Sequence, residues 1–249
     1  MGILGKLKVK LGFAALNEQE GLPQDLATEK EFLAVYNQCK PYTMTSAERM
    51  FSLHKTVEYV LGNNIEGDFV ECGVWKGGSS MVMAQTLLVN NVKDRTIFLY
   101  DTFEGMSTPN SEDKDLNGNA AKTLLNKFDK NEDGSIWCYS NLDEVKNNLN
   151  KTGYSEHKIK YVKGKVEDTI PETIPSKIAL LRLDTDWFDS TYHELVHLYP
   201  LLSKGGVLII DDYGHWQGAK KAVDTYFKEL KIAPLLHRID YTGRVLQKL

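Results

Sequence analysis

The sequence predicts an α/β domain built on a doubly wound, mostly parallel sheet that ends in an antiparallel hairpin. From residue 67 onward, short apolar segments rich in Val, Ile and Leu alternate with segments of helical periodicity. This pattern is typical of parallel strands joined by helices. Several of the apolar segments are nearly continuous, which indicates a sheet covered on both faces. At the C-terminus, residues 235–240 and 244–248 flank the turn Tyr241-Thr242-Gly243 and predict the hairpin.

The individual elements follow from this pattern in chain order. Helices are expected first, at 29–39 and 46–61. Strands are expected at 68–72, 96–100, 159–162, 178–183 and 206–210. The helices that join the strands are expected at 79–89, 120–127, 142–150, 191–202 and 217–230. We expect residues 1–66 to form an N-terminal arm and a helical cap over the mouth of the site. Residues 67–249 would form the core of a single structural domain.

Composition and charge place the chain among ordinary globular proteins. Its 249 residues are 42% hydrophobic and 26% charged, which is sufficient for a continuous core. The formal net charge of −4 gives no support to nucleic-acid binding, which leaves a basic footprint. No segment approaches the roughly 20 apolar residues of a membrane span. Because Cys39, Cys72 and Cys138 lack the spacing of a zinc site, we expect reduced thiols in a cytoplasmic protein.

The N-terminal segment differs from the rest of the chain. Lys6, Lys8 and Lys10 alternate with apolar residues, and the first acidic residue is Glu18. The segment lacks the long apolar stretch and the cleavage site of a signal peptide. A basic amphipathic start of this kind can lie on an anionic membrane surface. We favour the alternative that it packs on the domain or on a neighbouring subunit.

A glycine-rich turn follows the first strand. Glu71 stands near the end of that strand, and the chain then turns through Gly73 and Gly77 into a helix that begins near Ser79. Glycines allow close approach of the backbone to a ligand, and the start of a helix presents free N–H groups. The spacing is neither that of a P-loop nor the G-x-G-x-x-G of dinucleotide-binding proteins. The turn predicts a ligand contact, with a purely structural strand–helix turn as the alternative.

Asp101 extends this prediction to a nucleoside. It follows the second predicted strand, about thirty residues after Glu71. An acid at such a strand end can accept hydrogen bonds from ribose hydroxyl groups. Two strand-end acids at this separation favour a nucleoside-containing ligand. The alternative is that Asp101 only caps the loop that follows it.

Two further strands end in aspartates. The strand expected at 178–183 runs into Asp184 and Asp186, and the strand at 206–210 runs into Asp211 and Asp212. If these strands are neighbours, the carboxylates meet at one edge of the sheet, where a cation has to offset their repulsion. Hard oxygen ligands favour Mg²⁺ over zinc, with Mn²⁺ or Ca²⁺ as alternatives. We predict Asp184, Asp211 and Asp212 as metal ligands; aspartates that only form turns are the alternative.

These residues belong to longer segments that resemble the macrocin O-methyltransferase (TylF/MycF-type) family. The similarity runs from about residue 42 to residue 229, roughly three quarters of the chain. The segments that carry it are Tyr42-Thr43-Met44-Thr45-Ser46, Glu71-Cys72-Gly73-Val74-Trp75-Lys76-Gly77-Gly78, Tyr100-Asp101-Thr102-Phe103-Glu104-Gly105-Met106, Asp184-Thr185-Asp186-Trp187-Phe188-Asp189-Ser190-Thr191 and Ile210-Asp211-Asp212-Tyr213-Gly214-His215-Trp216. The N-terminal region and the loop at 108–119 show no match, and acceptor choice would reside there.

The resemblance implies a Rossmann-like class I methyltransferase fold that binds S-adenosylmethionine and Mg²⁺. It also implies O-methylation of a hydroxyl on a sugar or other diol-bearing small molecule or glycan, by a homo-oligomer. The glycine turn would hold the methionine end of the cofactor, and Asp101 would bind its ribose. The cofactor contacts implied together with Asp101 are Thr43, Met44, Glu71, Gly73, Gly77, Ser79, Thr102, Gly164 and Val166.

The base that deprotonates the acceptor hydroxyl is expected among the aspartates. Asp186 is the first candidate and Asp184 the second, while His193 and His197 on a predicted helix are weaker ones. A non-catalytic cofactor-binding or sensing protein on the same fold is the main rival hypothesis. The intact aspartates argue against it, because a sensor needs no metal. A nicotinamide-dependent reductase is a second rival, and it lacks the expected glycine spacing.

Overall fold

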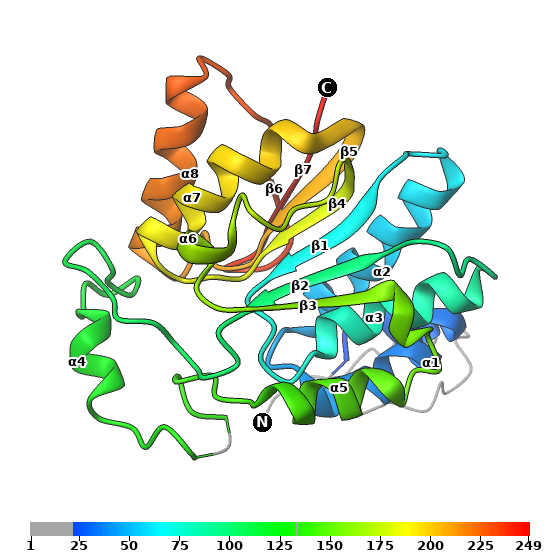
Figure 1. The fold of residues 1–249 in the computed structure, drawn as a ribbon, viewed down its shortest axis with the longest axis horizontal. Coiled ribbons are helices and arrows are strands. Elements are labelled where there is room, and N and C mark those ends of the chain that lie inside the picture. The colour runs from blue at the N-terminus through cyan, green and yellow to red at the C-terminus, as the bar shows by residue number, and fades with distance from the viewer. Residues whose placement is uncertain (1–21, 133) are drawn as a thin grey trace, which may run out of the picture.

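A seven-stranded sheet in the order β3-β2-β1-β4-β5-β7-β6 forms the centre of the molecule (Figure 1). The computed structural model describes residues 22–132 and 134–249. The strands are β1 (Asp68–Cys72), β2 (Ile97–Asp101), β3 (Ile159–Lys163), β4 (Ile178–Leu183), β5 (Leu202–Ile210), β6 (His237–Arg238) and β7 (Arg244–Gln247). Strands β1 to β5 are parallel, whereas β7 is antiparallel to both β5 and β6. The predicted α/β architecture with an antiparallel C-terminal hairpin is confirmed.

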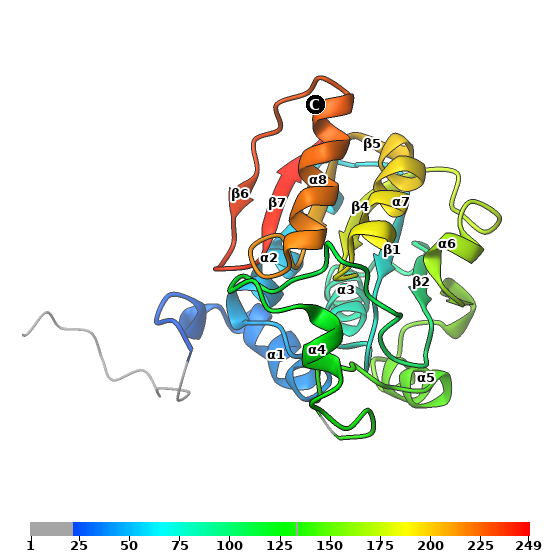
Figure 2. The same cartoon turned by 90° about the vertical axis from the view of Figure 1, so that its left-hand side faces the viewer.

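Helices cover both faces of this sheet. They are α1 (Lys30–Cys39), α2 (Ala47–Gly62), α3 (Gly78–Val89), α4 (Ala121–Leu125), α5 (Leu142–Asn150), α6 (Val166–Thr169), α7 (Phe188–Leu198) and α8 (Gln217–Glu229). Helices α1, α2, α3 and α5 lie on one side, and α6, α7 and α8 lie on the other (Figure 1). The β6–β7 hairpin forms the outer edge of the sheet next to α8 (Figure 2).

Most predicted elements lie within two residues of their expected bounds, and two differ by more. Helix α7 begins three residues early, at Phe188, whose N–H donates to Asp113 Oδ1 at 2.8 Å. It ends before Pro200, which has no N–H group to continue the helix. Leu202, expected in this helix, instead begins β5 and pairs with Ile178. Sequence periodicity therefore misplaced this one helix–strand boundary.

The N-terminal helices pack on the sheet as part of its covering layer. Phe32 of α1 and Leu53 of α2 belong to the same buried hydrophobic cluster as Phe69 of β1. The expected cap therefore lies on a face of the sheet, and the segment 42–49 is the part of it that reaches the cavity described below. A shared core fits the expectation of a single structural domain. The division at residue 66 stays a prediction.

The predicted location and assembly depend on membrane-spanning helices and on the basic N-terminal segment. In the part of the chain that the structure describes, no helix is long and apolar enough to cross a membrane. The basic segment around Lys6, Lys8 and Lys10 lies outside the described residues. The homo-oligomer and the role of this arm stay predictions.

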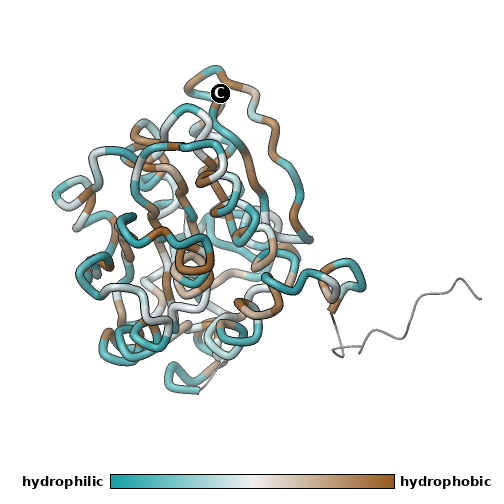
Figure 3. Tube along the Cα trace, turned by 90° about the vertical axis from the view of Figure 1, so that its right-hand side faces the viewer, coloured by the Kyte–Doolittle hydropathy of each residue, from teal (hydrophilic) through white to brown (hydrophobic). Residues whose placement is uncertain are grey.

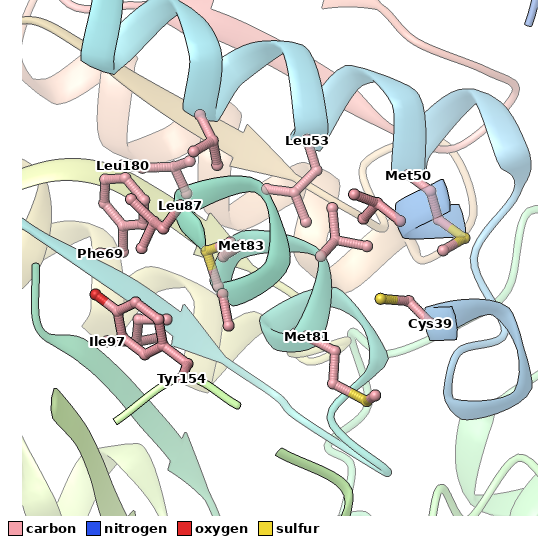
Figure 4. Packing of buried hydrophobic residues seen from close by; sticks show 14 of the residues in the cluster. Cys39, Met50, Leu53, Phe69, Met81, Met83, Leu87, Ile97, Tyr154 and Leu180 are labelled. Atoms are coloured by element: carbon pink, nitrogen blue, oxygen red, sulfur yellow. The ribbon is translucent and has the colours of Figure 1, made fainter. Parts of the chain in front are cut away.

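Separate hydrophobic clusters fill the two sides of the sheet. On one side, Leu53 of α2 and Leu87 of α3 point toward the sheet residues Phe69 and Leu180 (Figure 4). The cluster on the other side joins β4 and β5 to α7 and α8. Hydrophilic residues dominate the outermost turns and loops, and hydrophobic segments gather inside the fold (Figure 3). Burial of this apolar surface is the main favourable term in folding.

Leu180→Ala is expected to lower the free energy of unfolding by about 2–5 kcal/mol, because it leaves a cavity in a fully packed cluster. Urea denaturation followed by circular dichroism measures this loss. The control is Leu235→Ala, at a position that is 72% exposed, and it should change the free energy by less than about 0.5 kcal/mol. Equal losses in the two variants would show that the sheet core tolerates a cavity at Leu180.

Candidate active site

The carboxyl ends of β1, β4 and β5 meet at one edge of the sheet. The pairing of the strands continues one residue beyond their ends, since Asp184 N donates to Cys72 O and Asp211 N donates to Leu183 O, both at 2.8 Å. These hydrogen bonds place the two aspartates side by side, as the sequence predicted. Ligands of open α/β sheets bind at this edge.

The glycine turn after β1 has the backbone that glycine permits. Gly73 and Gly77 have φ angles of +81° and +88°, which side chains rarely allow. A Cβ atom at Gly73 would collide with the carbonyl oxygen of Asp184, and one at Gly78 would lie 2.5 Å from the carbonyl oxygen of Tyr42. The turn therefore brings the start of α3 against both the aspartate edge and the segment after α1.

Asp101 is held at the end of β2 by the same turn. Its Oδ2 accepts hydrogen bonds from the N–H groups of Val74 at 2.6 Å and Trp75 at 3.2 Å. Its Oδ1 accepts from Phe103 N at 2.6 Å. Burial raises the pKa of Asp101, and these backbone donors counteract part of the increase. The carboxyl group is fixed beside the turn, in a place where it can also face a ligand.

A cavity of about 360 Å³ lies over this edge. Twelve of the predicted site residues line it: Thr43, Met44, Gly73, Ser79, Asp101, Thr102, Gly164, Val166, Asp184, Asp186, Asp211 and Asp212. The lining includes neither Glu71 nor Gly77. The structure thus brings together segments that are far apart in sequence. Their individual roles stay predictions.

Asp184, Asp186, Asp211 and Asp212 form a carboxylate cluster in the lining of this cavity. Three carboxylate oxygens, one from each of Asp184, Asp211 and Asp212, all lie within 4.8 Å of one another. Burial raises the pKa values of Asp184 and Asp212 well above the usual range, and neighbouring carboxylates add to the increase. Burial and the charge of Asp184 raise the pKa of Asp186 to about 8. Burial and mutual repulsion therefore disfavour the ionised form of these carboxyl groups.

Arg182, which precedes the cluster on β4, offsets part of this charge. Its Nη1 lies 2.5 Å from Glu71 Oε1 and 2.8 Å from Asp184 Oδ2, and its Nη2 lies 2.7 Å from Asp211 Oδ1. Glu71 also accepts a hydrogen bond from the Ser80 hydroxyl. Arg182 and Glu71 are both almost completely buried. The position of Glu71 is that of a residue that holds Arg182, whereas the sequence predicted a cofactor contact.

A second arginine reaches the cluster from the first turn of α2. Arg49 pairs with Asp211 Oδ2 through Nη1 and with Asp240 Oδ2 through Nε, the latter at 3.0 Å. The Ser46 side chain caps α2 by accepting from Arg49 N at 3.1 Å. Asp211 therefore has an arginine at each carboxylate oxygen. Nothing in the sequence pattern connects Arg49 with an aspartate so distant along the chain.

The carboxylate cluster as a whole fits a hard divalent cation. Within the described residues, no ion pair joins Asp186 or Asp212 to an arginine or lysine. Carboxylate oxygens of Asp184, Asp211 and Asp212 lie within 4.8 Å of one another, an arrangement that ionised carboxylates adopt when a cation or a shared proton offsets their repulsion. Oxygen donors favour Mg²⁺, Mn²⁺ or Ca²⁺. Asp184, Asp211 and Asp212 are the residues that would hold it.

Sequence comparison identifies the family. The macrocin O-methyltransferase (TylF) family matches residues 24–248. The chain belongs to this family. The predicted family and the predicted enzyme class, an O-methyltransferase, are thereby confirmed, and a nicotinamide-dependent reductase is excluded.

Two relatives and one solved structure show how close the similarity is. Demethyldecarbamoylnovobiocin O-methyltransferase of Streptomyces niveus is 33% identical over 207 residues, which cover 83% of this chain and 76% of that protein. The 8-demethyl-8-(2,3-dimethoxy-alpha-L-rhamnosyl)-tetracenomycin-C 4'-O-methyltransferase of Streptomyces olivaceus is 31% identical over 202 residues, covering 81% and 74%. The structure of the O-methyltransferase NovP matches with a TM-score of 0.73 at 32% identity, covering 83% and 82%. These matches confirm the predicted Rossmann-like methyltransferase fold.

Several residues of this O-methyltransferase site were missed by sequence reasoning. They are Arg49, Arg182, His215, Trp216 and Tyr241, and all except Arg182 line the cavity. Arg182 had a signal, because an arginine inside an apolar strand requires an acidic partner. The weaker base candidates His193 and His197 do not line the cavity. Their rings contact each other, and His193 Nε2 lies 2.9 Å from Ile170 O.

Arg182→Met is expected to destabilise the fold by about 3–5 kcal/mol at pH 8, because it leaves buried carboxylates without their cation. Burial already raises the pKa of Glu71, and losing Arg182 raises it further. The folded variant then binds more protons than the unfolded chain, so its stability falls as pH rises. Urea denaturation at pH 5.5 and pH 8 should show the smaller deficit at pH 5.5. Arg182→Lys, which keeps the charge, should lose less, and a deficit independent of pH would contradict this account.

Proposed function

We propose that this chain transfers the methyl group of S-adenosylmethionine to a hydroxyl of a sugar or other diol-bearing acceptor, with a divalent cation at Asp184, Asp211 and Asp212. The observation that carries the proposal is the shared cavity. The three carboxylates and residues of the segments predicted to hold the cofactor line the same cavity. A donor bound by those segments would therefore lie next to a metal-bound acceptor.

The cofactor would lie over the β1, β2 and β3 ends of the sheet. Gly73 and Ser79 would face its methionine end, where the first N–H groups of α3 can meet its carboxylate. Asp101 would accept from its ribose. Gly164, whose N–H donates to Asp101 O at 3.0 Å, and Val166 would lie beside the adenine. Thr43, Met44 and Thr102 would complete the contacts.

The charge of the cavity favours an uncharged acceptor. Among its described lining residues, six are acidic and two, Arg49 and Lys165, are basic. Arg49 is already paired with Asp211 and Asp240. Arg182 and a divalent cation would offset part of the negative charge, and what remains would favour an acceptor without a diphosphate group. The names of the relatives place sugar-bearing natural products among the substrates of this family, which agrees with a neutral glycoside.

The aspartates would activate the acceptor hydroxyl. A bound divalent cation would lower the pKa of a coordinated hydroxyl. Asp186, at the cavity wall beside Asp212, would accept the proton, with Asp184 as the second candidate. Fixing donor and acceptor in line contributes up to roughly 7–11 kcal/mol to lowering the barrier. Arg182 keeps Asp184 and Asp211 in place while this happens.

Asp184→Asn is expected to reduce turnover on the order of 100-fold or more at saturating Mg²⁺, because it removes one metal ligand. Calorimetry should show S-adenosylhomocysteine affinity within about threefold of the wild type, because the cofactor segments stay intact. The matched control is Asp224→Asn, an exposed carboxylate of α8 paired with Lys220, which should keep full activity. Full activity of Asp184→Asn would rule out the metal assignment.

Asp101→Asn is expected to weaken S-adenosylhomocysteine binding by about tenfold or more, because the amide N–H₂ would face backbone donors and lose the ribose contact. Calorimetric titration of the purified protein measures it, and NADH should give no binding. Asp68→Asn is the matched control, since Asp68 accepts from Thr96 N at the opposite end of the sheet. Unchanged cofactor affinity in Asp101→Asn would contradict the assignment of the ribose site.

A further inference from the structure

The turn of the C-terminal hairpin reaches the cavity. Tyr241 and Thr242, between β6 and β7, are part of its lining. The Tyr241 side chain is 56% exposed although it lies on the cavity wall. Among the described lining residues, Tyr241 and Met44 are the two large apolar residues that are exposed. An exposed aromatic ring at the wall of a cavity is available for a ligand.

The turn is held rigidly by Asp240. Its Oδ1 accepts from Thr242 N at 2.9 Å and from Gly243 N at 2.7 Å. Its Oδ2 accepts from the Ser46 hydroxyl at 2.8 Å and pairs with Arg49. Asp240 therefore fixes the turn internally and ties it to the first turn of α2.

A second set of contacts fixes the turn to the aspartate loop after β5. The Thr242 hydroxyl donates to Asp211 O at 2.8 Å, and Gly214 N donates to Thr242 O at 2.9 Å. A Cβ at Gly214 would collide with the carbonyl oxygen of Tyr241. The Tyr241 hydroxyl lies 3.4 Å from His215 Nδ1. The Tyr241 ring thus has a defined place beside His215, three residues after the proposed ligand Asp212.

The order of the strands separates Tyr241 from the proposed cofactor site. Asp101 ends β2 and Gly164 follows β3, both on one side of the carboxylate cluster, which lies at β4 and β5. The turn that carries Tyr241 belongs to β7 and β6, on the other side of β5. A donor over β1 to β3 leaves the β7 side of the cavity for the second substrate.

We propose that Tyr241 is a specificity-determining residue that contacts the acceptor, and that Asp240 is the residue that positions it. This inference rests on the proposed methyl transfer. The Tyr241 ring would pack on the part of the acceptor that extends away from the hydroxyl groups at the carboxylate cluster. The C-terminal hairpin then has a second task beyond closing the edge of the sheet.

The test uses two probes with the same vicinal diol, phenyl α-L-rhamnopyranoside and free L-rhamnose. Binding of each is measured by ligand-observed NMR to full-length protein loaded with S-adenosylhomocysteine and Mg²⁺. Tyr241→Ala should weaken binding of the phenyl glycoside by about tenfold, because the ring contact is lost. Rhamnose and S-adenosylhomocysteine affinity should stay within about twofold. Tyr241→Phe should resemble the wild type, and Asp240→Asn should lie between the two.

Leu235→Ala is the matched control, because Leu235 is an exposed apolar residue two positions before β6 and outside the cavity lining. It should leave the affinity of both probes unchanged. Equal weakening of both probes and of S-adenosylhomocysteine by Tyr241→Ala would reduce Tyr241 to a structural role and overturn the proposal. Unchanged glycoside binding by that variant, or no glycoside binding by cofactor-loaded wild type, would also overturn it. Failure of the wild type to bind S-adenosylhomocysteine would instead contradict the proposed function.

Discussion

The ion pairs of Arg182 with Glu71, Asp184 and Asp211 are the contacts on which the arrangement of this site depends. Parallel strands bring their carboxyl ends to one edge, so Glu71 near the end of β1 and the acids that follow β4 and β5 meet there. Buried carboxylates at such distances destabilise the fold unless cations neutralise them. A guanidinium inside β4 can reach three of them at once, because its planar group offers several donors in a fixed geometry. Neighbouring strands can therefore carry acidic residues at their carboxyl ends and still pair with each other.

The same charge balance explains why the edge remains suited to a reaction. One arginine and a second from α2 neutralise only part of the cluster, and burial together with the neighbouring carboxylates raises the pKa values of Asp184, Asp186 and Asp212. A fully neutralised edge would bind no cation, and an edge without arginines would be costly to fold. The site lies between these limits. Its surplus of negative charge faces the cavity, where a cation and a cationic sulfonium donor would both be stabilised.

Much of the fold could be predicted because its signals are local. Apolar strands, helical periodicity and the glycine turn are properties of short segments, and the strand-end aspartates follow from where those strands stop. The end of α7 and the start of β5 were misplaced, since the region around Pro200 and Leu202 has apolar residues compatible with either element. Arg49 could not have been found in the same way. Its contacts with Asp211 and Asp240 exist only after the first turn of α2 and the C-terminal hairpin meet.

That meeting gives the two ends of the described chain a common role. The Asp211 side chain forms an ion pair with Arg49 of the N-terminal helical layer. The Asp211 backbone carbonyl accepts a hydrogen bond from the Thr242 hydroxyl of the C-terminal hairpin. Asp240 joins the two contributions through Ser46 and Arg49. Neither contact belongs to the hydrophobic clusters that fill the two faces of the sheet. The position of the two contacts at a proposed metal ligand fits the proposal that the N-terminal helices and the C-terminal hairpin contact the substrates, while the alternating strands and helices supply the edge of the sheet on which the site assembles.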